Sequence, residues 1–145
     1  MYRIPRFRVQ LVRESTHATA TRTISAPVDA FEILREYLDS QDRETFVVLL
    51  LDTRNAVIGL HVASIGTLNA SLVHPREVFK VAFLANAASL IAAHNHPSGD
   101  CSPSQEDLAL TARLKQAGEL LGLPVVDHLI IGDGHFVSLK ERGLL

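Results

Sequence analysis

The stretch that decides the fold is His94-Asn95-His96-Pro97-Ser98-Gly99-Asp100-Cys101-Ser102-Pro103-Ser104-Gln105-Glu106-Asp107. It follows a short apolar run and leads into a helical pattern, so it joins the end of a strand to the start of a helix. Residues two apart on a strand point to the same side, which brings the imidazoles of His94 and His96 together. Two imidazoles and one carboxylate form a ligand set that catalytic zinc sites use, with a fourth position kept for water. The sequence therefore predicts one Zn²⁺ per chain, held by His94, His96 and Asp107.

Each of these three residues also has an ordinary structural explanation. Two histidines at the end of a strand can make hydrogen bonds without binding a metal. A carboxylate in the first turn of a helix interacts favourably with the helix dipole. The spacing favours the metal site, because Asp107 lies eleven residues after His96 and Ser104 lies eight residues after it.

Strand and helix patterns alternate on both sides of this stretch. Helical periodicity predicts three helices, of about twelve residues after Ser25, over 75–88 and over 103–121. Apolar and alternating runs predict strands over 7–12, 45–51, 56–63, 89–93, 125–131 and 136–139. The alternation predicts the α/β (α+β) class, with one domain over residues 24–145 preceded by a strand and basic arm over residues 1–23.

The helix ends and buried faces give more detailed expectations. Ser25 is expected to cap the first helix, and Val28 to lie on its buried face. Phe83 and Leu121 are expected to face the core from the second and third helices. Gly122 and Pro124 are expected to end the third helix.

Composition excludes several classes of protein. The chain has 145 residues, of which 47% are hydrophobic and 21% charged, an ordinary globular balance that excludes a disordered tail, collagen and a coiled coil. No apolar run is long enough to span a membrane, and the N-terminus has no signal-peptide pattern. A single cysteine cannot form an intrachain disulfide, which fits a reducing compartment. We therefore expect a cytoplasmic protein.

The net charge of −2 argues against a nucleic-acid-binding surface over the whole domain. The charge is uneven, however, because residues 1–22 carry five arginines and one acidic residue, Glu14. This segment is either a basic arm for an acidic partner or a solvated strand edge protected by its charges.

The spacing His-x-His, ten residues, then Asp, with Ser three before the Asp, resembles the JAMM motif of MPN-domain metalloproteases. Three stretches are similar to the RadC family of bacterial JAMM-type proteins: HNHPSGD at 94–100, HPREVF at 74–79 and VVDHLIIG at 125–132. The resemblance runs from about residue 24 onward. It implies a three-layer MPN sandwich, cytidine-deaminase-like, with a mixed sheet flanked by helices. Longer RadC members carry an N-terminal helix-hairpin-helix region for which this chain has no room, so it resembles a short form.

The resemblance also assigns roles to two further residues, Ser104 and Glu44. Ser104 would hold the attacking water or stabilise the oxyanion. Its alternative role is a helix cap, but Ser102, followed by Pro103 and Gln105, makes the better capping box and would leave Ser104 free.

A carboxylate must move the proton from water to the leaving amine. Glu44, just before an apolar strand, matches the position of this residue in the JAMM pattern, and its alternative role is a charged strand end that faces water. Glu77 is the competing candidate, but Pro75 begins its helix, so Glu77 is expected to interact with the helix dipole. Glu44 is therefore preferred.

Other residues carry weaker signals. Asp127 and His128 are similar to a family motif, and their side chains should face opposite sides of a strand, with a structural role or a role in supporting a ligating histidine. Cys101 lies in the motif loop, but no paired base is evident, so it is expected to be incidental. The remaining histidines, His17, His61, His74 and His135, lack metal-ligand spacing.

The predicted function is a zinc metallopeptidase of the JAMM type that cleaves a peptide or isopeptide bond in a protein or peptide substrate. The first alternative is a DNA-repair or DNA-associated accessory protein of the RadC type, for which the basic arm is the support. The second is a scaffold that keeps the fold without turnover. The sequence indicates neither the substrate nor the oligomeric state.

Overall fold

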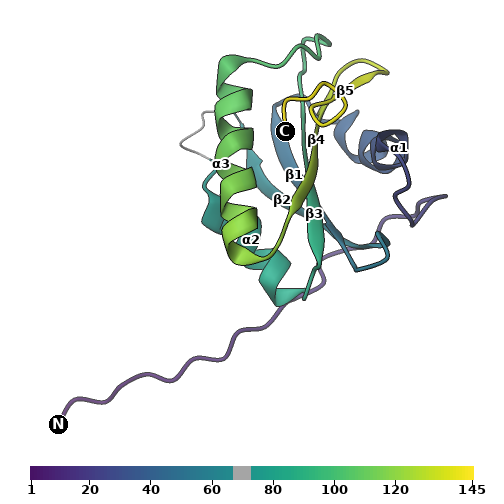
Figure 1. Ribbon diagram of the computed structural model, residues 1–145. Coiled ribbons are helices and arrows are strands. Elements are labelled where there is room, and N and C mark those ends of the chain that lie inside the picture. Colours follow the sequence, from purple (N-terminus) through teal and green to yellow (C-terminus); the bar gives the residue numbers. More distant parts are fainter. Residues whose placement is uncertain (67–72) are drawn as a thin grey trace.

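The computed structural model describes residues 1–66 and 73–145 (Figure 1). In these ranges the chain forms three helices and five strands. They are α1 (Pro27–Leu38), β1 (Thr45–Leu51), β2 (Val57–Ile65), α2 (Pro75–Leu84), β3 (Ser89–Asn95), α3 (Gln105–Leu121), β4 (Val125–Ile131) and β5 (Phe136–Ser138). None of the described helices is both long and apolar enough to cross a membrane.

The strands form one mixed sheet in the order β2-β1-β3-β4-β5. β1 pairs antiparallel with β2 and with β3, and β4 pairs antiparallel with β5, so both predicted hairpins are confirmed. β3 and β4 run parallel. Parallel neighbours need a long crossover, which the helix α3 provides between them.

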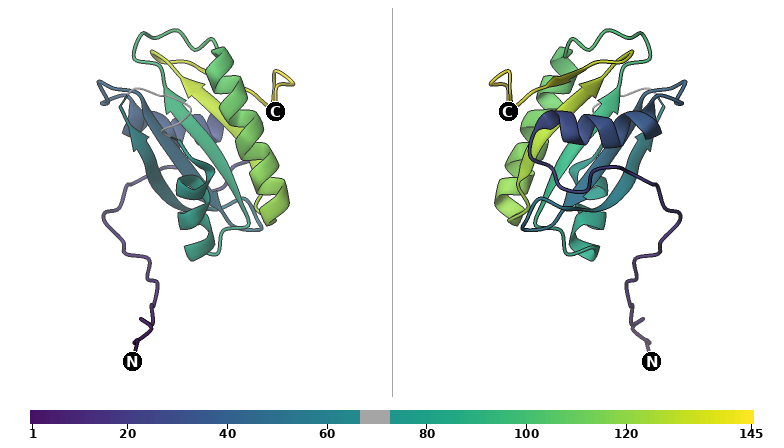
Figure 2. Two further views of the ribbon diagram at one scale, coloured as in Figure 1. Left: turned by 90° about the vertical axis from the view of Figure 1, so that its left-hand side faces the viewer. Right: turned by 90° about the vertical axis from the view of Figure 1, so that its right-hand side faces the viewer.

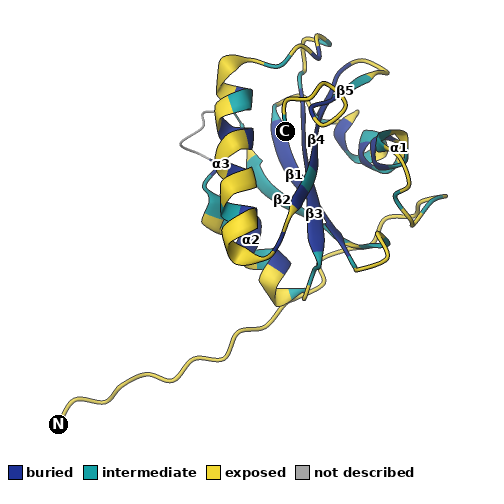
Figure 3. Ribbon diagram, viewed as in Figure 1, coloured by how far each residue is buried: buried dark blue, intermediate teal, exposed yellow. Residues whose placement is uncertain are grey.

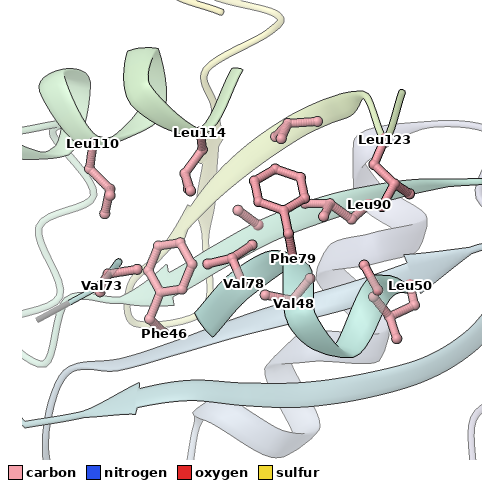
Figure 4. Close-up of a cluster of buried hydrophobic side chains, with 13 residues drawn as sticks. Phe46, Val48, Leu50, Val73, Val78, Phe79, Leu90, Leu110, Leu114 and Leu123 are labelled. Carbon is pink, nitrogen blue, oxygen red and sulfur yellow. The ribbon is translucent and has the colours of Figure 1, made fainter. Parts of the chain in front are cut away.

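Helices cover both faces of the sheet, as Figure 2 shows. Alternate residues of β1 serve the two faces: Val47 and Leu49 pack with α1, whereas Phe46 and Val48 pack with α2 and α3. Figure 4 shows the second of these clusters. The strands β1, β3 and β4 are consequently buried along most of their length, whereas β2 at the edge of the sheet is mostly half-buried. The outer faces of the helices are exposed (Figure 3). The predicted α+β class, with a mixed sheet between helical layers, is confirmed.

The pairing of β3 with β4 shifts by one residue near its start. Leu90 pairs with Val125, but the next residue, Ile91, pairs with Asp127. One residue of β4 is therefore passed over, as in a β-bulge, and the faces of the following residues exchange. As a result, His128 lies opposite Ala92, on the face that α2 and α3 cover.

The predicted strand at 7–12 is wrong, because residues 1–22 contain no strand or helix. Apolar and charged residues alternate there as in a strand, but the segment runs away from the sheet without a pairing partner (Figure 1). Phe7, for example, is 85% exposed. The first bridge to the sheet joins Thr23 to Ala56.

The expected cap of α1 is also wrong. Ala26 occupies the N-cap position without a side-chain bond. The Asp29 carboxylate instead accepts hydrogen bonds from the backbone N–H groups of Ser25 and Ala26, at 2.8 and 3.0 Å. The buried stripe passes through Ala30, and Val28, about half a turn away, is 47% exposed.

Two further residues expected in the core lie at its edge. Phe83 is 49% exposed and Leu121 is 44% exposed. Both line an apolar hollow between α2 and α3. The helix α2 also ends at Leu84, earlier than predicted, and Asn86 then takes a left-handed conformation with φ of 54°. By contrast, α3 ends as expected at Gly122, whose φ is 71°.

Candidate metal centre

The three predicted ligands meet where the end of β3 approaches the start of α3. His94 is the sixth of the seven residues of β3. His96 follows the strand and stays in line with it, because its backbone N–H donates to the carbonyl of Ile131 at 2.8 Å. Asp107 is the third residue of α3. The spacing of the motif is therefore the length of the loop that returns the chain to the strand end.

The ligand atoms converge on one point. The Nε2 atoms of His94 and His96 are 3.0 Å apart. Asp107 Oδ1 lies 3.2 Å from the Nε2 of His94, and Oδ2 lies 3.3 Å from the Nε2 of His96. Among the residues that the structure describes, this is the group whose ligand atoms all lie close enough to hold a metal ion, within 4.8 Å of one another.

The hydrogen bond at Nδ1 of His96 determines whether its Nε2 presents a hydrogen or a lone pair to this point. His96 Nδ1 lies 2.7 Å from the carbonyl oxygen of Asp100, which can only accept, so Nδ1 carries the hydrogen. A neutral His96 therefore directs the lone pair of Nε2 toward His94 and Asp107. Lone pairs and a carboxylate that converge in this way require a cation between them, either a proton or a metal ion. The donor set of two nitrogens and one carboxylate fits zinc.

The pKa shifts of His96 and Asp107 also favour a positive charge at this point. The hydrogen bond with Asp107 raises the pKa of His96 above its ordinary value, against the opposite effect of burial. Burial by itself would raise the pKa of Asp107, but the imidazoles of His94 and His96, when protonated, outweigh it and hold that pKa far below its usual range. The carboxylate is therefore ionised and ready to bind a cation.

His128 supports the ligand His94, which is one of the roles expected for the Asp127-His128 pair. Its Nε2 lies 2.8 Å from Nδ1 of His94, and its Nδ1 lies 2.6 Å from the hydroxyl oxygen of Thr111. Complete burial lowers the pKa of His128 well below its ordinary value. Sequence reasoning missed Thr111, although its place four residues after Asp107 puts both on one face of a helix.

Asp127 points to the other side of β4 and holds the segment that follows β5. Its carboxylate accepts hydrogen bonds from the hydroxyl of Ser138 at 2.6 Å and from the backbone N–H of Lys140 at 3.1 Å. Asp127 is therefore structural, while its neighbour serves the candidate site.

Ser104 is the cap of α3, so the predicted cap at Ser102 is wrong. The Ser104 hydroxyl accepts from the backbone N–H of Asp107 at 3.0 Å, and Asp107 Oδ2 accepts from the N–H of Ser104 at 2.9 Å. The N–H of Ser102 instead donates to the Asp100 carboxylate at 2.9 Å, in a turn before the helix. The cap engages a lone pair of the Ser104 oxygen and leaves its hydroxyl hydrogen out of that bond.

Glu44 shares an open cavity of about 820 Å³ with two of the ligands. It lies half-buried immediately before β1. The lining of this cavity includes Arg43, Glu44, His96, Ser98, Ser104 and Asp107. Glu44 is thus within the space from which a water or substrate would approach the ligands.

The competing candidate, Glu77, lies elsewhere. It lies half-buried in the first turn of α2, with 43% of its side chain exposed, and pairs with Lys80 at 3.0 Å. It is not part of the cavity lining. The motif around it builds the helix start, because His74 Nδ1 accepts from the N–H of Arg76 at 3.1 Å. Of the two candidates, Glu44 lines the cavity beside the ligands and Glu77 does not.

Asn95, between the two histidines, is a second residue that sequence reasoning missed. Its Oδ1 accepts from the N–H of Thr45 at 2.7 Å, and its Nδ2 donates to the carbonyl of Arg43 at 3.0 Å. The amide therefore holds the backbone on both sides of Glu44. Only the pairing of β1 with β3 reveals this contact, since fifty residues separate the partners.

Cys101, in the loop between β3 and α3, is buried and is not in the ligand set. Its Sγ lies 3.5 Å from the carbonyl of His135, and burial raises the pKa of the thiol. A buried thiol with a raised pKa is a poor nucleophile.

Comparison with known proteins assigns the family. The sequence model of a family described as "RadC-like JAB domain" matches residues 24–144, most of the chain. The chain belongs to this family. The RadC-like JAB domain accordingly covers all eight helices and strands described above, and the expectation from the three motifs is confirmed.

Curated relatives agree with this assignment. A UPF0758 protein of Methanosarcina mazei is 51% identical over 124 residues, which are 86% of this chain and 54% of the relative. One of Desulforamulus reducens is 55% identical over 122 residues, 84% of this chain and 54% of the relative. A third, of Moorella thermoacetica, is 51% identical over 138 residues, 94% of this chain and 60% of the relative. The chain thus spans a little over half the length of these relatives.

Proposed function

We propose that this domain is a zinc-dependent hydrolase that cleaves an amide bond, in a peptide or isopeptide linkage, by attack of water. The observation that carries the proposal is the convergence of His94, His96 and Asp107 on one point at the wall of a cavity that also contains Glu44. Catalytic zinc sites with three protein ligands, one open side and a nearby carboxylate have a similar arrangement, which supports the proposal.

Each residue has a defined task in this proposal. When bound, zinc polarises the amide carbonyl and lowers the pKa of water. Glu44 takes the proton from the attacking water and delivers it to the leaving amine, which would otherwise depart as an unstable anion. The Ser104 hydroxyl donates its hydrogen to the oxyanion that develops on the carbonyl oxygen. Its position at the cap of α3 holds it beside the ligand Asp107.

Two measurements test the metal and the proton carrier separately. The first is elemental analysis of the protein purified without added metal, next to His96→Ala. We expect about one zinc per chain, lost in the variant. An absence of zinc, even after zinc is offered, would overturn the proposal.

The second measurement is hydrolysis of a panel of peptide and isopeptide probes by Glu44→Gln. We expect zinc to be retained and turnover to fall by roughly 10²–10⁴-fold, the usual contribution of a general acid–base residue. Glu77→Gln is the matched control, because its carboxylate is outside the cavity. Normal turnover by Glu44→Gln together with loss in Glu77→Gln would reverse the assignment.

A second function, association with DNA, has one supporting observation. Residues 1–22 are extended and almost wholly exposed, and they carry the arginines Arg3, Arg6, Arg8, Arg13 and Arg22. An arm of this kind can contact phosphates by charge alone. Binding to duplex or single-stranded DNA that weakens steeply with salt, and that is lost when the arm is removed, would favour this function. Absence of binding at low salt would exclude it.

A further inference from the structure

A continuous line of hydrogen bonds leads away from the candidate metal point into the core. It begins at His94, whose Nδ1 lies 2.8 Å from Nε2 of His128. Nδ1 of His128 lies 2.6 Å from the hydroxyl oxygen of Thr111. The Thr111 hydroxyl donates to the backbone carbonyl of Asp107 at 2.7 Å. The line therefore begins beside the Asp107 carboxylate and returns to the backbone of the same residue.

The chemistry of the last group fixes the direction of every bond. A backbone carbonyl can only accept, so the single hydrogen of Thr111 is committed to it. Thr111 must then accept from Nδ1–H of His128. A neutral imidazole with its hydrogen on Nδ1 has a lone pair on Nε2, and this lone pair accepts from Nδ1–H of His94. His94 is left with the lone pair of its own Nε2 directed at Asp107 and His96.

Surrounding residues leave these groups few other partners. The residues His94, Thr111 and His128 are all buried. The ring of Phe46 lies 5.5 Å from that of His128 and 6.1 Å from that of His94, between ring centroids. In such an apolar setting a polar hydrogen without an acceptor is costly, so the order of the bonds is strongly determined.

We propose that Thr111 is a positioning residue that, through His128, fixes His94 as the tautomer whose Nε2 can bind a metal. The inference rests on the proposed metal site, but it concerns residues that do not touch the metal. Second partners of this kind orient ligating histidines and set which nitrogen carries the hydrogen. Here the second partner is itself an imidazole, and its own tautomer requires a third group.

The fold places the three groups together by two local features. Thr111 follows Asp107 by four residues on α3, so one helical turn presents both the ligand and the end of the line. The register shift between β3 and β4 turns His128 toward α3 and not toward α1. The parallel pairing then sets it two residues from the level of His94 on the neighbouring strand.

Thr111→Val is the discriminating variant, because it keeps the shape of the side chain and removes the hydroxyl. Without an acceptor at Thr111, the stable arrangement of His128 carries its hydrogen on Nε2. That hydrogen points at His94, whose own hydrogen then moves to Nε2, where the metal must bind. Zinc binding would require both rings to change back and would leave a buried N–H group of His128 unpaired. We expect zinc affinity to fall by roughly 10–100-fold.

Thr111→Ser is the matched control, since it keeps the hydroxyl and loses only a methyl group. We expect its zinc affinity, measured by competition with a chromophoric chelator, to stay within about threefold of the wild type. The second readout is the ¹⁵N NMR spectrum of the ring nitrogens in metal-free protein. His128 should carry its hydrogen on Nδ1 in the wild type and in Thr111→Ser, and on Nε2 in Thr111→Val.

Several results would overturn the inference. One is a wild-type His128 with its hydrogen on Nε2, a measurement that needs no variant and so does not depend on whether Thr111→Val folds. Another is equal zinc affinity in Thr111→Val and the wild type. Zinc loss in Thr111→Ser equal to that in Thr111→Val would assign the effect to packing and not to the hydroxyl.

The proposed function can fail separately from this inference. If the wild type binds no zinc, the hydrolase proposal is lost, while the ring tautomers in metal-free protein still test the line of bonds. If zinc binds normally and the tautomers contradict the expected order, only the role of Thr111 is lost.

Discussion

The candidate site has a buried half and an exposed half, which are held in different ways. The buried half consists of His94, Asp107, Thr111 and His128. The exposed half consists of Glu44, His96 and Ser104. The side chain of His94 is 1% exposed and its ring is held by another side chain in the core, whereas that of His96 is 14% exposed and bonds to the carbonyl of a loop residue, Asp100. Two imidazoles that would bind the same metal thus depend on different parts of the fold.

The buried half should therefore determine how firmly the metal is held, and the exposed half should determine the reaction. The sheet and α3 fix the buried half, so its geometry should persist without a metal. The exposed half lines the cavity. In the proposed reaction it would meet the substrate, so it should decide what reacts. Changes in the two halves are therefore expected to have different signatures, and the following predictions test this from the largest effect to the smallest.

Removing a ligand from each half gives the largest contrast. We expect both Asp107→Ala and His96→Ala to lose stoichiometric zinc. Only Asp107→Ala should also destabilise the metal-free protein, by about 1 kcal/mol, because it removes the acceptor for the N–H of Ser104 at the start of α3. Elemental analysis and urea unfolding at pH 8 in the presence of a chelator measure the two effects. Equal destabilisation by both variants would contradict the proposed division.

The link between β3 and Glu44 gives the next effect. Asn95→Ala leaves the N–H of Thr45 and the carbonyl of Arg43 without their partner. We expect a loss of about 1–3 kcal/mol in the free energy of unfolding. Turnover should fall by about tenfold while zinc affinity changes by less than about threefold, since the ligands do not move. A parallel loss of zinc would mean that Asn95 holds the histidines and not Glu44.

The pH dependence of the metal-free protein should distinguish the halves by sign. The raised pKa of His96 stabilises the folded chain below the ordinary histidine pKa of about 6.5, and this contribution disappears as pH rises through the folded-state value. The lowered pKa of His128 acts in the opposite sense, because stability is lost as pH falls below about 6.5. Urea midpoints between pH 5 and 8, with a chelator present, should therefore peak near the middle of this range.

The control for that curve is His96→Ala. It should abolish the decline on the alkaline side and keep the decline on the acid side, because His128 is unchanged. A variant curve with both declines intact would remove His96 as the cause.

The smallest effect is expected at Cys101, which belongs to neither half. Cys101→Ala should keep the zinc content of the wild type. In the folded wild type the thiol should react with an aromatic disulfide reagent roughly tenfold or more slowly than in urea, because it is buried and its pKa is raised. Rapid reaction in the folded protein would show that the loop over Cys101 opens readily.

Local patterns predicted the candidate ligands of the site better than the contacts that support them. Strand alternation placed His94 and His96 on one side, and the helix start returned Asp107 to them. Thr111 and Asn95 escaped notice because their partners are seventeen to fifty-two residues away in sequence. No local signal predicts the register shift in β4 that turns His128 toward α3.

The errors in the fold have the same physical origin. Residues 7–12 have the alternation of a strand, but a strand also needs a neighbour, which their sequence does not supply. Val28 and Phe83 fit helical periodicity, yet the sheet lies against a narrower stripe of each helix than the periodicity allows. Ser102 and Ser104 are both good caps, and the turn at Asp100 decides between them.

One oxygen atom of Asp107 gives the start of α3 a further property. Oδ2 accepts from the amide of Ser104 at 2.9 Å and lies 3.3 Å from Nε2 of His96. A cation that binds this oxygen alters the hydrogen bond between the Ser104 N–H and Oδ2, which protects that amide from exchange with solvent. Hydrogen–deuterium exchange at that single amide therefore carries information about occupancy of the site. The exchange rate of the Ser104 amide should therefore report whether the site holds a cation, and it can be measured without any substrate.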